Sequence, residues 1–408
     1  MRSESLIFTL ALLLLPTVAA WTQGATQRRV RLGSPITHSD WMLRDPAPAW
    51  GPEGVHQILD RCRDCGWTRV YWRCFDGGRA LYKSKLMDPL HNFDADENYH
   101  RDHGSQWVLD KLAQYDWAEF DAFAEAVSYG HSIGLEVHAW LSINEDDHGY
   151  GLTSRFTRDH PHTRWVRRDG TSYRSQQSFA FPEVRAYKLA LLHEILAYGP
   201  DGVFLDWIRT GDVRDNPQTD AEGVANHGYE APNVRRFTAR YGLDPHDVPN
   251  GDERWVAVRS EPQTAFMREA HAITEHADPS MLVSVMVHNP WGYRGSPTDT
   301  PYDGNLRGLL LDVSTWAREG LMDEAVAAGY YREGGDAELA YRALQNETGG
   351  RCDLWLFGWI ASLEQFAEDV RLAERIGAAE LLLWESDYVA LPPANEPLVS
   401  AMRDYAGR

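Results

Sequence analysis

Residues 182–206 read PEVRAYKLALLHEILAYGPDGVFLD, a pattern in which a helix is followed by a strand. Pro182 is a favourable first helical residue, and apolar side chains then recur every three to four positions, as on one face of a helix. Gly199 is typical of a helix end, because glycine adopts the left-handed conformation without strain. The run Val203–Leu205 contains no polar residue, which is typical of a strand buried on both faces of a parallel sheet.

The same succession of helix and strand recurs along the chain. Apolar runs predict eight strands: Ile36–Ser39, Arg69–Cys74, Leu135–Ile143, Gly202–Trp207, Met281–Val287, Glu324–Tyr331, Asp353–Trp359 and Glu380–Glu385. Eight strands that alternate with helices predict an α/β protein with a (β/α)8 or TIM barrel, built as a single domain over residues 34–405. An open, doubly wound sheet is the alternative, but no glycine-rich phosphate-binding turn follows the first strand.

Cap and stop residues define the predicted helices between these strands. A short polar residue before an apolar stretch is typical of a helix start, and a glycine after it of a helix end. On these signals, helices are predicted over Val55–Cys65, after a capping box formed by Asp116 and Glu119, over Pro262–Ala277, and between Ser362 and Gly377.

Two predicted connections are much longer than the others, namely Phe75–Asp116 after the second strand and Ile208–Pro262 after the fourth. Long loops in compact domains usually carry function. In a (β/α)8 barrel, the connections that follow strands lie over the carboxyl ends of those strands, where active sites are built. The candidate chemistry is therefore expected at the strand ends.

The composition limits the partners that this chain can bind. It has 408 residues, 43% of them hydrophobic, which is enough for a large core. A net charge of −20 disfavours general binding of nucleic acid or anionic membranes, so a neutral or cationic partner is expected. The 16 tryptophans offer flat apolar rings, which suit stacking on sugars as well as packing in the core.

The amino terminus reads as a signal peptide over residues 1–20. An arginine precedes the apolar run Leu6–Leu15, and Val18–Ala20 offers the small residues of a cleavage site. The apolar run is shorter than a transmembrane helix requires, so an N-terminal anchor is only the alternative. A secreted or periplasmic protein is expected, whose mature chain begins near Trp21 or Thr26 and does not insert stably into a membrane.

The remaining motifs predict neither a cofactor nor a catalytic metal. Cys62 and Cys65 form a C-x-x-C without a second pair, and their place on an apolar helix face predicts buried side chains. The run Asp94–Asn98 starts like a calcium loop, but Tyr99 stands where an EF-hand requires glycine. An EF-hand is therefore excluded, and a looser calcium site stays open.

Asp206 is the strongest candidate for a catalytic residue, because a carboxylate at the end of a buried strand is costly unless it is paired or used. The alternative is a structural ion pair with Arg209 or Arg214. Glu145 follows the third strand and Glu385 ends the eighth. Each is therefore a candidate for a second carboxylate at the same end of the barrel.

Polar and aromatic side chains near the strand ends are candidates for substrate binding. At the end of the third strand they occupy alternate positions, which share one side of the strand. At least half of the tryptophans at strand ends are expected to pack in the core instead. The candidates are Trp72, Arg73, His138, Trp140, Asn144, Trp207, Arg209, His288, Asn289, Trp291, Trp359 and Trp384.

Two carboxylates across a cleft, one acting as acid and the other as base or nucleophile, are what cleavage of a glycosidic bond requires. We therefore expect hydrolysis of O-glycosidic bonds in a poly- or oligosaccharide, with Asp206 as nucleophile or base and Glu385 or Glu145 as acid/base. One alternative is a carbohydrate-binding barrel without hydrolysis. Another is a metal-dependent amidohydrolase, for which His160–His162 supplies an H-x-H motif, although between the third and fourth strands.

Three segments of the chain resemble one known family. They are SFAFPEVRAYKLALLHEIL at Ser178–Leu196, DGVFLDWIRT at Asp201–Thr210 and LLLDVSTWAREGLMDEA at Leu309–Ala325. They resemble the glycosyl hydrolase-like family ten, TIM-barrel glycoside hydrolases with a D-G-x-x-x-D segment on the fourth strand. The resemblance covers roughly residues 35–390 and implies a catalytic role for Asp206 only. Asp323 matches a family position at the start of the sixth strand, far from the carboxyl ends of the strands, so a structural role is expected for it. At Trp207–Arg209 the chain departs from the second aspartate and the tyrosine that many relatives carry.

Overall fold

The computed structural model describes the chain from Arg29 onward, with gaps. The described residues are 29–37, 40, 50–90, 114–117, 119–144, 146, 153–206, 208, 218–288, 303–328, 336–359, 362–384 and 396–407. The predicted signal peptide and the calcium-like run Asp94–Asn98 lie outside them. Within the described part of the chain, no helix has the length and apolar content needed to cross a membrane.

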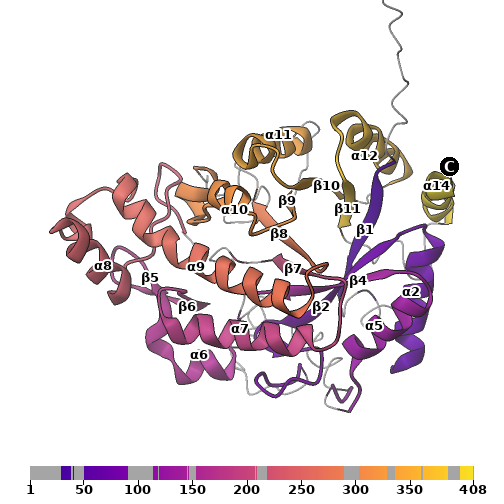
Figure 1. Ribbon diagram of the computed structural model, residues 1–408, viewed down its shortest axis with the longest axis horizontal. Helices are drawn as coiled ribbons and strands as arrows, with labels where there is room; N and C mark the ends of the chain where they lie inside the picture. Colours follow the sequence, from indigo (N-terminus) through magenta and orange to yellow (C-terminus); the bar gives the residue numbers. More distant parts are fainter. Residues whose placement is uncertain are drawn as a thin grey trace, which may run out of the picture.

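Eight parallel strands close into a barrel, with helices packed around it (Figure 1). The strands are β1 (Arg31–Ile36), β2 (Arg69–Asp76), β4 (Glu136–Ser142), β7 (Gly202–Asp206), β8 (Leu282–His288), β9 (Glu324–Ala328), β10 (Asp353–Trp359) and β11 (Glu380–Trp384). Because β1 pairs with both β2 and β11, the sheet is closed. The predicted TIM barrel is therefore confirmed, and the open doubly wound sheet is excluded.

The first strand lies earlier in the chain than predicted, at Arg31–Ile36 instead of Ile36–Ser39. Two of its inward positions, Arg31 and Gly33, are not apolar, so it contains no hydrophobic run. Arg31 donates hydrogen bonds to carboxylates inside the barrel. A side chain at Gly33 would clash with the Glu380 carboxylate, because an added Cβ would lie 2.2 Å from Glu380 Oε1. The hydrophobic signal that marks the other strands is therefore missing here.

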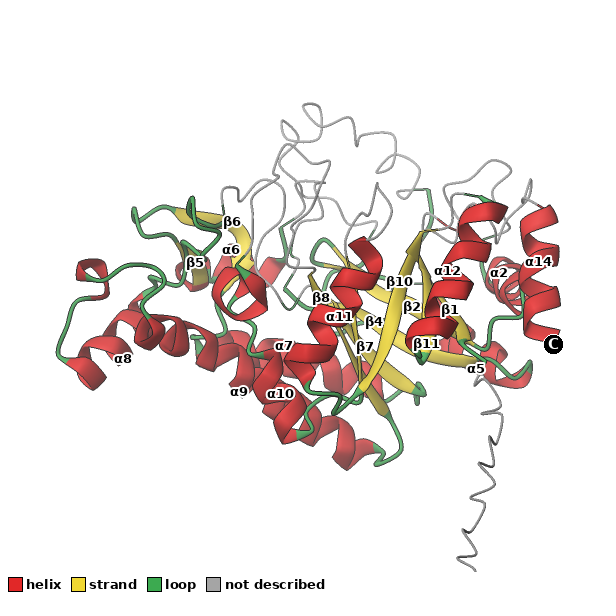
Figure 2. Cartoon of the chain, turned by 90° about the horizontal axis from the view of Figure 1, so that it is seen from above, coloured by secondary structure: helices red, strands yellow, loops and turns green. Residues whose placement is uncertain are grey.

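The helices follow the strands and cover the outside of the barrel (Figures 1 and 2). They include α2 (Pro52–Asp64), α5 (Ala122–Ser132), α6 (Arg155–Asp159), α7 (Pro182–Leu196), α8 (Ala231–Tyr241), α9 (Glu253–Ala277), α10 (Val313–Glu319), α11 (Asp336–Thr348), α12 (Leu363–Ile376) and α14 (Glu396–Gly407). The predicted ends of α12 are confirmed. Ser362 Oγ accepts a hydrogen bond from the backbone N–H of Gln365, and Gly377 follows the helix with a φ of 76°.

Two predicted helix starts are wrong. α5 is capped by Asp121, whose Oδ1 accepts from the N–H of Ala124 at 3.1 Å, and the predicted cap Asp116 only closes a turn before it. α9 is capped by Asp252 and runs through Pro262, the residue at which the sequence predicts its start. The proline is tolerated because burial of the long helix against the barrel outweighs the one backbone hydrogen bond that proline removes.

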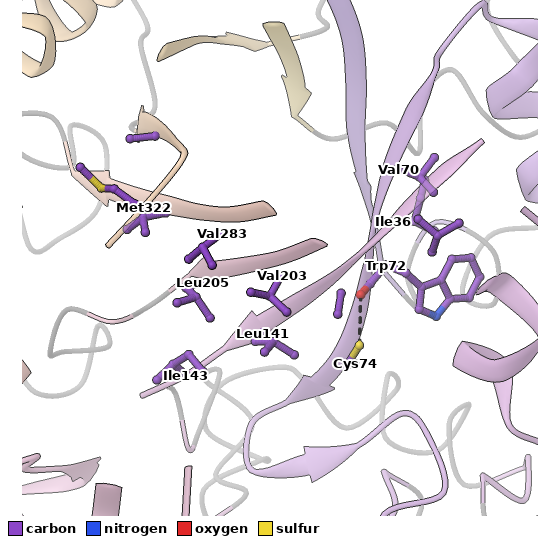
Figure 3. Packing of buried hydrophobic residues seen from close by; sticks show 14 of the residues in the cluster. Ile36, Val70, Trp72, Cys74, Leu141, Ile143, Val203, Leu205, Val283 and Met322 are labelled. Atoms are coloured by element: carbon purple, nitrogen blue, oxygen red, sulfur yellow. Dashed lines mark hydrogen bonds between the residues drawn. The ribbon is translucent and has the colours of Figure 1, made fainter. Parts of the chain in front are cut away.

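A continuous apolar layer separates the barrel from its helices (Figure 3). It is built from the outward residues of the strands and the inward faces of the helices. Figure 3 shows Trp72 in this layer, beside Ile36 and Val70. Cys62 and Cys65 are buried here as free thiols, which confirms that the C-x-x-C is part of the core.

Charged side chains fill the amino-terminal end of the barrel interior and form what we call the basal ion cluster: Arg31, Arg69, Glu324 and Glu380. Arg69 Nη1 lies 2.7 Å from Glu324 Oε2, and Arg31 Nε lies 2.5 Å from Glu380 Oε2. Tyr71 OH also donates to Glu380, at 2.5 Å. The arginines hold the pKa of Glu324 below its ordinary value although burial acts to raise it, whereas burial raises the pKa of Glu380.

Two insertions lie side by side at the edge of the barrel (Figure 2). After β4 the chain forms a hairpin of β5 (Arg164–Val166) and β6 (Ser172–Gln177), which was not predicted. The predicted long loop Ile208–Pro262 contains α8 and the first turns of α9. The two insertions are joined by a hydrogen bond of 2.9 Å from the N–H of Arg168 to the carbonyl of Asn226. Much of the predicted loop is therefore a packed extension of the barrel wall.

Glu230 is a buried carboxyl group at the base of this extension, directly before α8. Its Oε1 accepts hydrogen bonds from Ser178 Oγ at 2.5 Å and from Asn233 Nδ2 at 2.7 Å. Burial raises the pKa of Glu230 to about 7, against the opposing effect of the hydrogen bond from Ser178. Burial also lowers the pKa of the nearby His227 to about 3. Both groups therefore favour their neutral forms in the folded protein.

We expect the Glu230→Gln variant to lose part of the pH dependence of unfolding. A carboxyl group whose pKa is about 7 when folded and near 4.5 when unfolded loses stability as pH rises from 4.5 through 7. The total loss is about 3 kcal/mol. Glutamine stays neutral, so denaturant unfolding from pH 5 to 8 should show wild type losing stability relative to the variant. His227 is present in both proteins, so its titration cancels in the comparison. A difference in unfolding free energy between wild type and variant that stays constant with pH would contradict the prediction.

Candidate active site

Asp206 lies at the carboxyl end of the barrel, as predicted, because it is the last residue of β7. Only 3% of it is exposed. Its Oδ2 accepts a hydrogen bond from Trp140 Nε1 at 3.0 Å, and its carbonyl accepts one from the N–H of Ile143 at 2.9 Å. An indole N–H can only donate, so its hydrogen bond favours the charged carboxylate over the neutral acid.

Arg73 contributes a buried positive charge to the same end of the barrel and is 5% exposed. Its guanidinium lies 4.6 Å from the centre of the Trp140 ring, within the range of a cation–π contact. Arg73 Nη2 also donates to Ser142 Oγ at 2.9 Å, and Ser142 is the register partner of Asp206 on the adjacent strand. The structure thus brings together three of the predicted site residues: Arg73, Trp140 and Asp206.

Aromatic rings surround Trp140 at the carboxyl end of the barrel interior. The rings of Trp140 and Trp384 meet edge to face with 5.3 Å between their centres, and Phe357 lies 5.4 Å from Trp384. Trp140 and Phe357 are buried, whereas Trp384 keeps part of its surface exposed. Trp384 therefore offers an accessible aromatic surface next to the ring that binds Asp206.

The family of this chain follows from a sequence model that covers the strands of Arg73, Trp140 and Asp206. The model described as Glycosyl hydrolase-like 10 matches residues 55–348, which include β2, β4 and β7. This protein belongs to the glycosyl hydrolase-like 10 family. Asp206 thus lies inside the matched part of the family member. Among curated proteins, none matches the sequence.

Solved structures with the same fold include glycosidases. The catalytic domain of β-amylase from Paenibacillus polymyxa aligns with 92% of this chain and 97% of its own, at 10% identity and a TM-score of 0.56. α-L-Fucosidase isoenzyme 2 from Paenibacillus thiaminolyticus aligns with 93% of this chain at 13% identity and a TM-score of 0.55. The chain spans about half of that fucosidase, 49% of its length. At such identities the similarity shows the fold.

Trp72 does not belong to the interior of the glycosyl hydrolase-like 10 barrel. It is 2% exposed and packs in the apolar layer between strands and helices (Figure 3). On β2, the residues at 69, 71 and 73 face inward, so the alternation of a strand directs residue 72 outward. The expectation that Trp72 binds substrate is therefore wrong.

His138 lies inside the barrel but near its amino end, two residues after the start of β4. It is fully buried, and its Nε2 lies 3.6 Å from Glu136 Oε2, next to the basal ion cluster. Gly202 makes room for the imidazole, because a Cβ there would lie 2.4 Å from His138 Nδ1. Burial lowers the pKa of His138. A role in substrate binding at the carboxyl end is not compatible with this depth.

Asn144 belongs to a buried polar cluster behind the end of β4. Its Oδ1 accepts a hydrogen bond from the N–H of Gln177 at 3.3 Å. Asp146 Oδ2 accepts from the N–H of Ser154 at 3.2 Å and from the hydroxyl of Thr157, and Lys188 Nζ lies 3.7 Å from Asp146 Oδ1. These contacts fix the chain on both sides of position 145.

Lys188 is the residue of this cluster that sequence reasoning missed. It occupies the apolar face of α7, between Val184 and Leu191, where a lysine needs a buried partner. That position was the available signal. Burial lowers the pKa of Lys188 although Asp146 acts to raise it. The pair anchors the segment after β4 to an outer helix.

The other candidates cannot be placed from the described residues. His288 and Trp359 end strands β8 and β10, but their side chains are not described. The remaining candidates lie outside the described residues: Glu145, Trp207, Arg209, Asn289, Trp291 and Glu385. Arg214, the second partner considered for Asp206, lies there as well.

Two motifs with alternative interpretations have local roles. His160 Nδ1 lies 2.9 Å from the carbonyl of Phe156, and His162 Nε2 lies 3.2 Å from Glu183 Oε1. Both belong to the turn that follows α6, and His162 contacts the first turn of α7. Asp323 Oδ2 accepts from the N–H of Val283 at 2.8 Å just before β9, which confirms its structural role.

Proposed function

We propose that this family member is a glycoside hydrolase that cleaves O-glycosidic bonds of a poly- or oligosaccharide. The observation that carries the proposal is the buried Asp206 at the carboxyl end of a TIM barrel, held by the indole N–H of Trp140. Active sites of TIM barrels lie at that end. A carboxylate kept there in its charged form has the chemistry of a nucleophile or general base.

The second carboxylate of the mechanism is assigned to Glu385, with Glu145 as the other candidate. Glu385 directly follows Trp384 at the end of β11, and Glu145 lies between the anchored residues Asn144 and Asp146. Either would protonate the leaving oxygen while Asp206 attacks the sugar or activates a water. Sugar rings would stack on Trp384, because aromatic faces bind the apolar faces of sugars.

Further substrate contacts are assigned to residues beyond the described part of the strand ends. They lie at or shortly after the ends of β7, β8 and β10: Trp207, Arg209, His288, Asn289, Trp291 and Trp359. Trp140 donates a hydrogen bond to Asp206 inside the barrel, and Arg73 lies over the Trp140 ring. No cofactor enters this mechanism.

The experiment that tests the proposal compares the wild type with Asp206→Asn on a panel of neutral polysaccharides and oligosaccharides. Hydrolysis is measured by the release of new reducing ends. The proposal predicts release from at least one substrate by the wild type and none above background by the variant. Saturable binding of a sugar without any release would favour the carbohydrate-binding barrel instead.

The acid is identified by comparing Glu385→Gln with Glu145→Gln on two substrates of the same sugar. One carries an ordinary sugar leaving group and the other a phenol that leaves without protonation. Loss of the general acid should slow the first substrate about 100-fold or more and the second much less. If a substitution slows both substrates equally, or slows neither of them, the substituted residue is not the general acid.

Export is proposed for this protein on the basis of residues 1–20. We expect the mature chain to begin near Trp21 or Thr26, because a signal peptidase cleaves after small residues such as those at Val18–Ala20. Amino-terminal sequencing of the protein from culture fluid or periplasm checks this. Recovery of a chain that still begins with Met1 would contradict the signal peptide.

A further inference from the structure

A short chain of contacts links a buried cation to Asp206. The guanidinium of Arg73 lies 4.6 Å from the ring centre of Trp140, and the indole N–H of Trp140 donates to Asp206 Oδ2 at 3.0 Å. Arg73 is 5% exposed and Trp140 is 1% exposed. Water is therefore largely excluded, and electrostatic interactions in such surroundings are much stronger than at a surface.

The order of these contacts has a chemical consequence. A cation over an indole ring draws electron density toward its face, which leaves the N–H at the ring edge a stronger hydrogen-bond donor. A stronger donor stabilises the carboxylate form of its acceptor. The charge of Arg73 acts in the same direction through space, since Arg73 also binds Ser142, the register partner of Asp206.

We infer that Arg73 is a positioning residue that acts through Trp140 to keep Asp206 ionised and aligned. This deepens the proposed function, on which it rests only for the catalytic use of Asp206. Under this inference Asp206 acts as the nucleophile or general base, which must be an anion, and another carboxyl group acts as the general acid. Neither Arg73 nor Trp140 has to touch the substrate.

The strands next to β7 contribute described neighbours of Asp206. β4 contributes Trp140 and the neutral Ser142, and β8 contributes Met286 to the same interior cluster. The titratable residues Glu145, Arg209, His288 and Glu385 follow or end the strands β4, β7, β8 and β11, and their side chains are not described. All four stay intact in the variants below, so their influence is common to every protein that is compared.

The test reads the charge of Asp206 directly and does not depend on activity. The protein is labelled with 13C at its aspartate carboxyl groups, and the signal of Asp206 is the one that Asp206→Asn removes. Its pH titration is then recorded in the full-length mature wild type, Trp140→Phe, Arg73→Met and Arg73→Lys. Trp140→Phe keeps an aromatic ring and removes the N–H, while Arg73→Lys keeps the charge and removes the planar group.

Matched controls remove the same groups elsewhere. Trp316 also donates its indole N–H at 3.0 Å, to Thr264 Oγ1, and is fully buried outside the barrel. Arg168 also lies over a ring, 5.7 Å from the centre of Tyr229. Trp316→Phe and Arg168→Met therefore remove the same kinds of contact elsewhere, and we expect both to leave the titration of Asp206 unchanged.

The expected result is an upward shift of the Asp206 midpoint by about one pH unit or more in Trp140→Phe and in Arg73→Met, since hydrogen bonds to charged groups have about that strength. Arg73→Lys should shift it less than Arg73→Met.

If a substrate is known, the acid limb of the pH profile of kcat/KM should move with the midpoint, whereas a merely structural role would lower kcat at all pH values. A shift in Trp140→Phe but in neither Arg73 variant would overturn the role of Arg73, and no shift in any folded variant would overturn the whole inference. These results stand apart from the proposed function, which fails separately if no sugar is hydrolysed.

Discussion

The Asp206→Asn variant is expected to fold normally and to lose hydrolytic activity by about a thousand-fold or more. Asparagine has the volume of aspartate, and its Oδ1 can still accept the hydrogen bond from Trp140 Nε1. The transition state, however, loses the anion that attacks the sugar or accepts a proton from the attacking water. Affinity for sugar should persist, because stacking on Trp384 does not need the charge. Initial rates on the identified substrate, thermal melting and sugar binding check the three parts.

Asp201→Asn is the matched control for this change. Asp201 precedes the same strand at the opposite end of the barrel, where its Oδ2 accepts from the N–H of Val137 at 2.7 Å and lies 2.8 Å from His131 Nε2. Its loss should affect stability and leave kcat within a few-fold. If Asp206→Asn instead melts much lower and its folded fraction still hydrolyses sugar, Asp206 is a structural ion-pair partner and the catalytic assignment fails.

The Arg69→Met variant is expected to lose about 3–5 kcal/mol of unfolding free energy, because it removes the more deeply buried of the two cations that pair with Glu324 and Glu380. Arg69 is 1% exposed and lies 2.7 Å from Glu324 Oε2 and 3.7 Å from Glu380 Oε2. Methionine fills much of the same space, so the loss reports the charge and its hydrogen bonds more than a cavity. Denaturant unfolding followed by circular dichroism near neutral pH measures it.

Arg268→Met is the control for this variant. Arg268 donates two hydrogen bonds to Glu319, at 2.6 and 2.8 Å, but its side chain is 48% exposed. Ion pairs at the surface contribute about 1 kcal/mol or less, because water and salt screen them. A loss in Arg69→Met no larger than in Arg268→Met would show that the basal ion cluster contributes little to stability.

The barrel itself could be predicted from the sequence because seven strands bury both faces. A strand with helices on one side and the barrel interior on the other needs apolar side chains at successive positions, and this produces the runs at Gly202–Asp206 and Asp353–Trp359. The position of Asp206 at the end of such a run placed it at the carboxyl end. Helix ends followed where a single cap residue decides them, as at Ser362 and Gly377.

The same apolar character means that the sequence does not show whether a side chain points into the barrel or toward the helices, or how far along the barrel axis it lies. When both faces of a strand are buried, the sequence does not show that Arg73 faces inward while Trp72 faces the helices. Likewise, His138 and Trp140 share one side of β4, but only the register with neighbouring strands shows that His138 lies beside the basal ion cluster and Trp140 beside Asp206. Depth in a barrel depends on how strands are staggered, which no single segment encodes.

Seven of the eight strands and the carboxyl-end position of Asp206 were thus present in the local sequence, since each depends on the pattern of one segment. The basal ion cluster and the contact between Trp140 and Asp206 were decided by the tertiary structure. Arg31 and Glu380 are 349 positions apart, and Trp140 and Asp206 are 66 apart, so each pair meets only when the sheet closes. A buried charge is stable only beside its partner, and the closed barrel determines which side chains become partners.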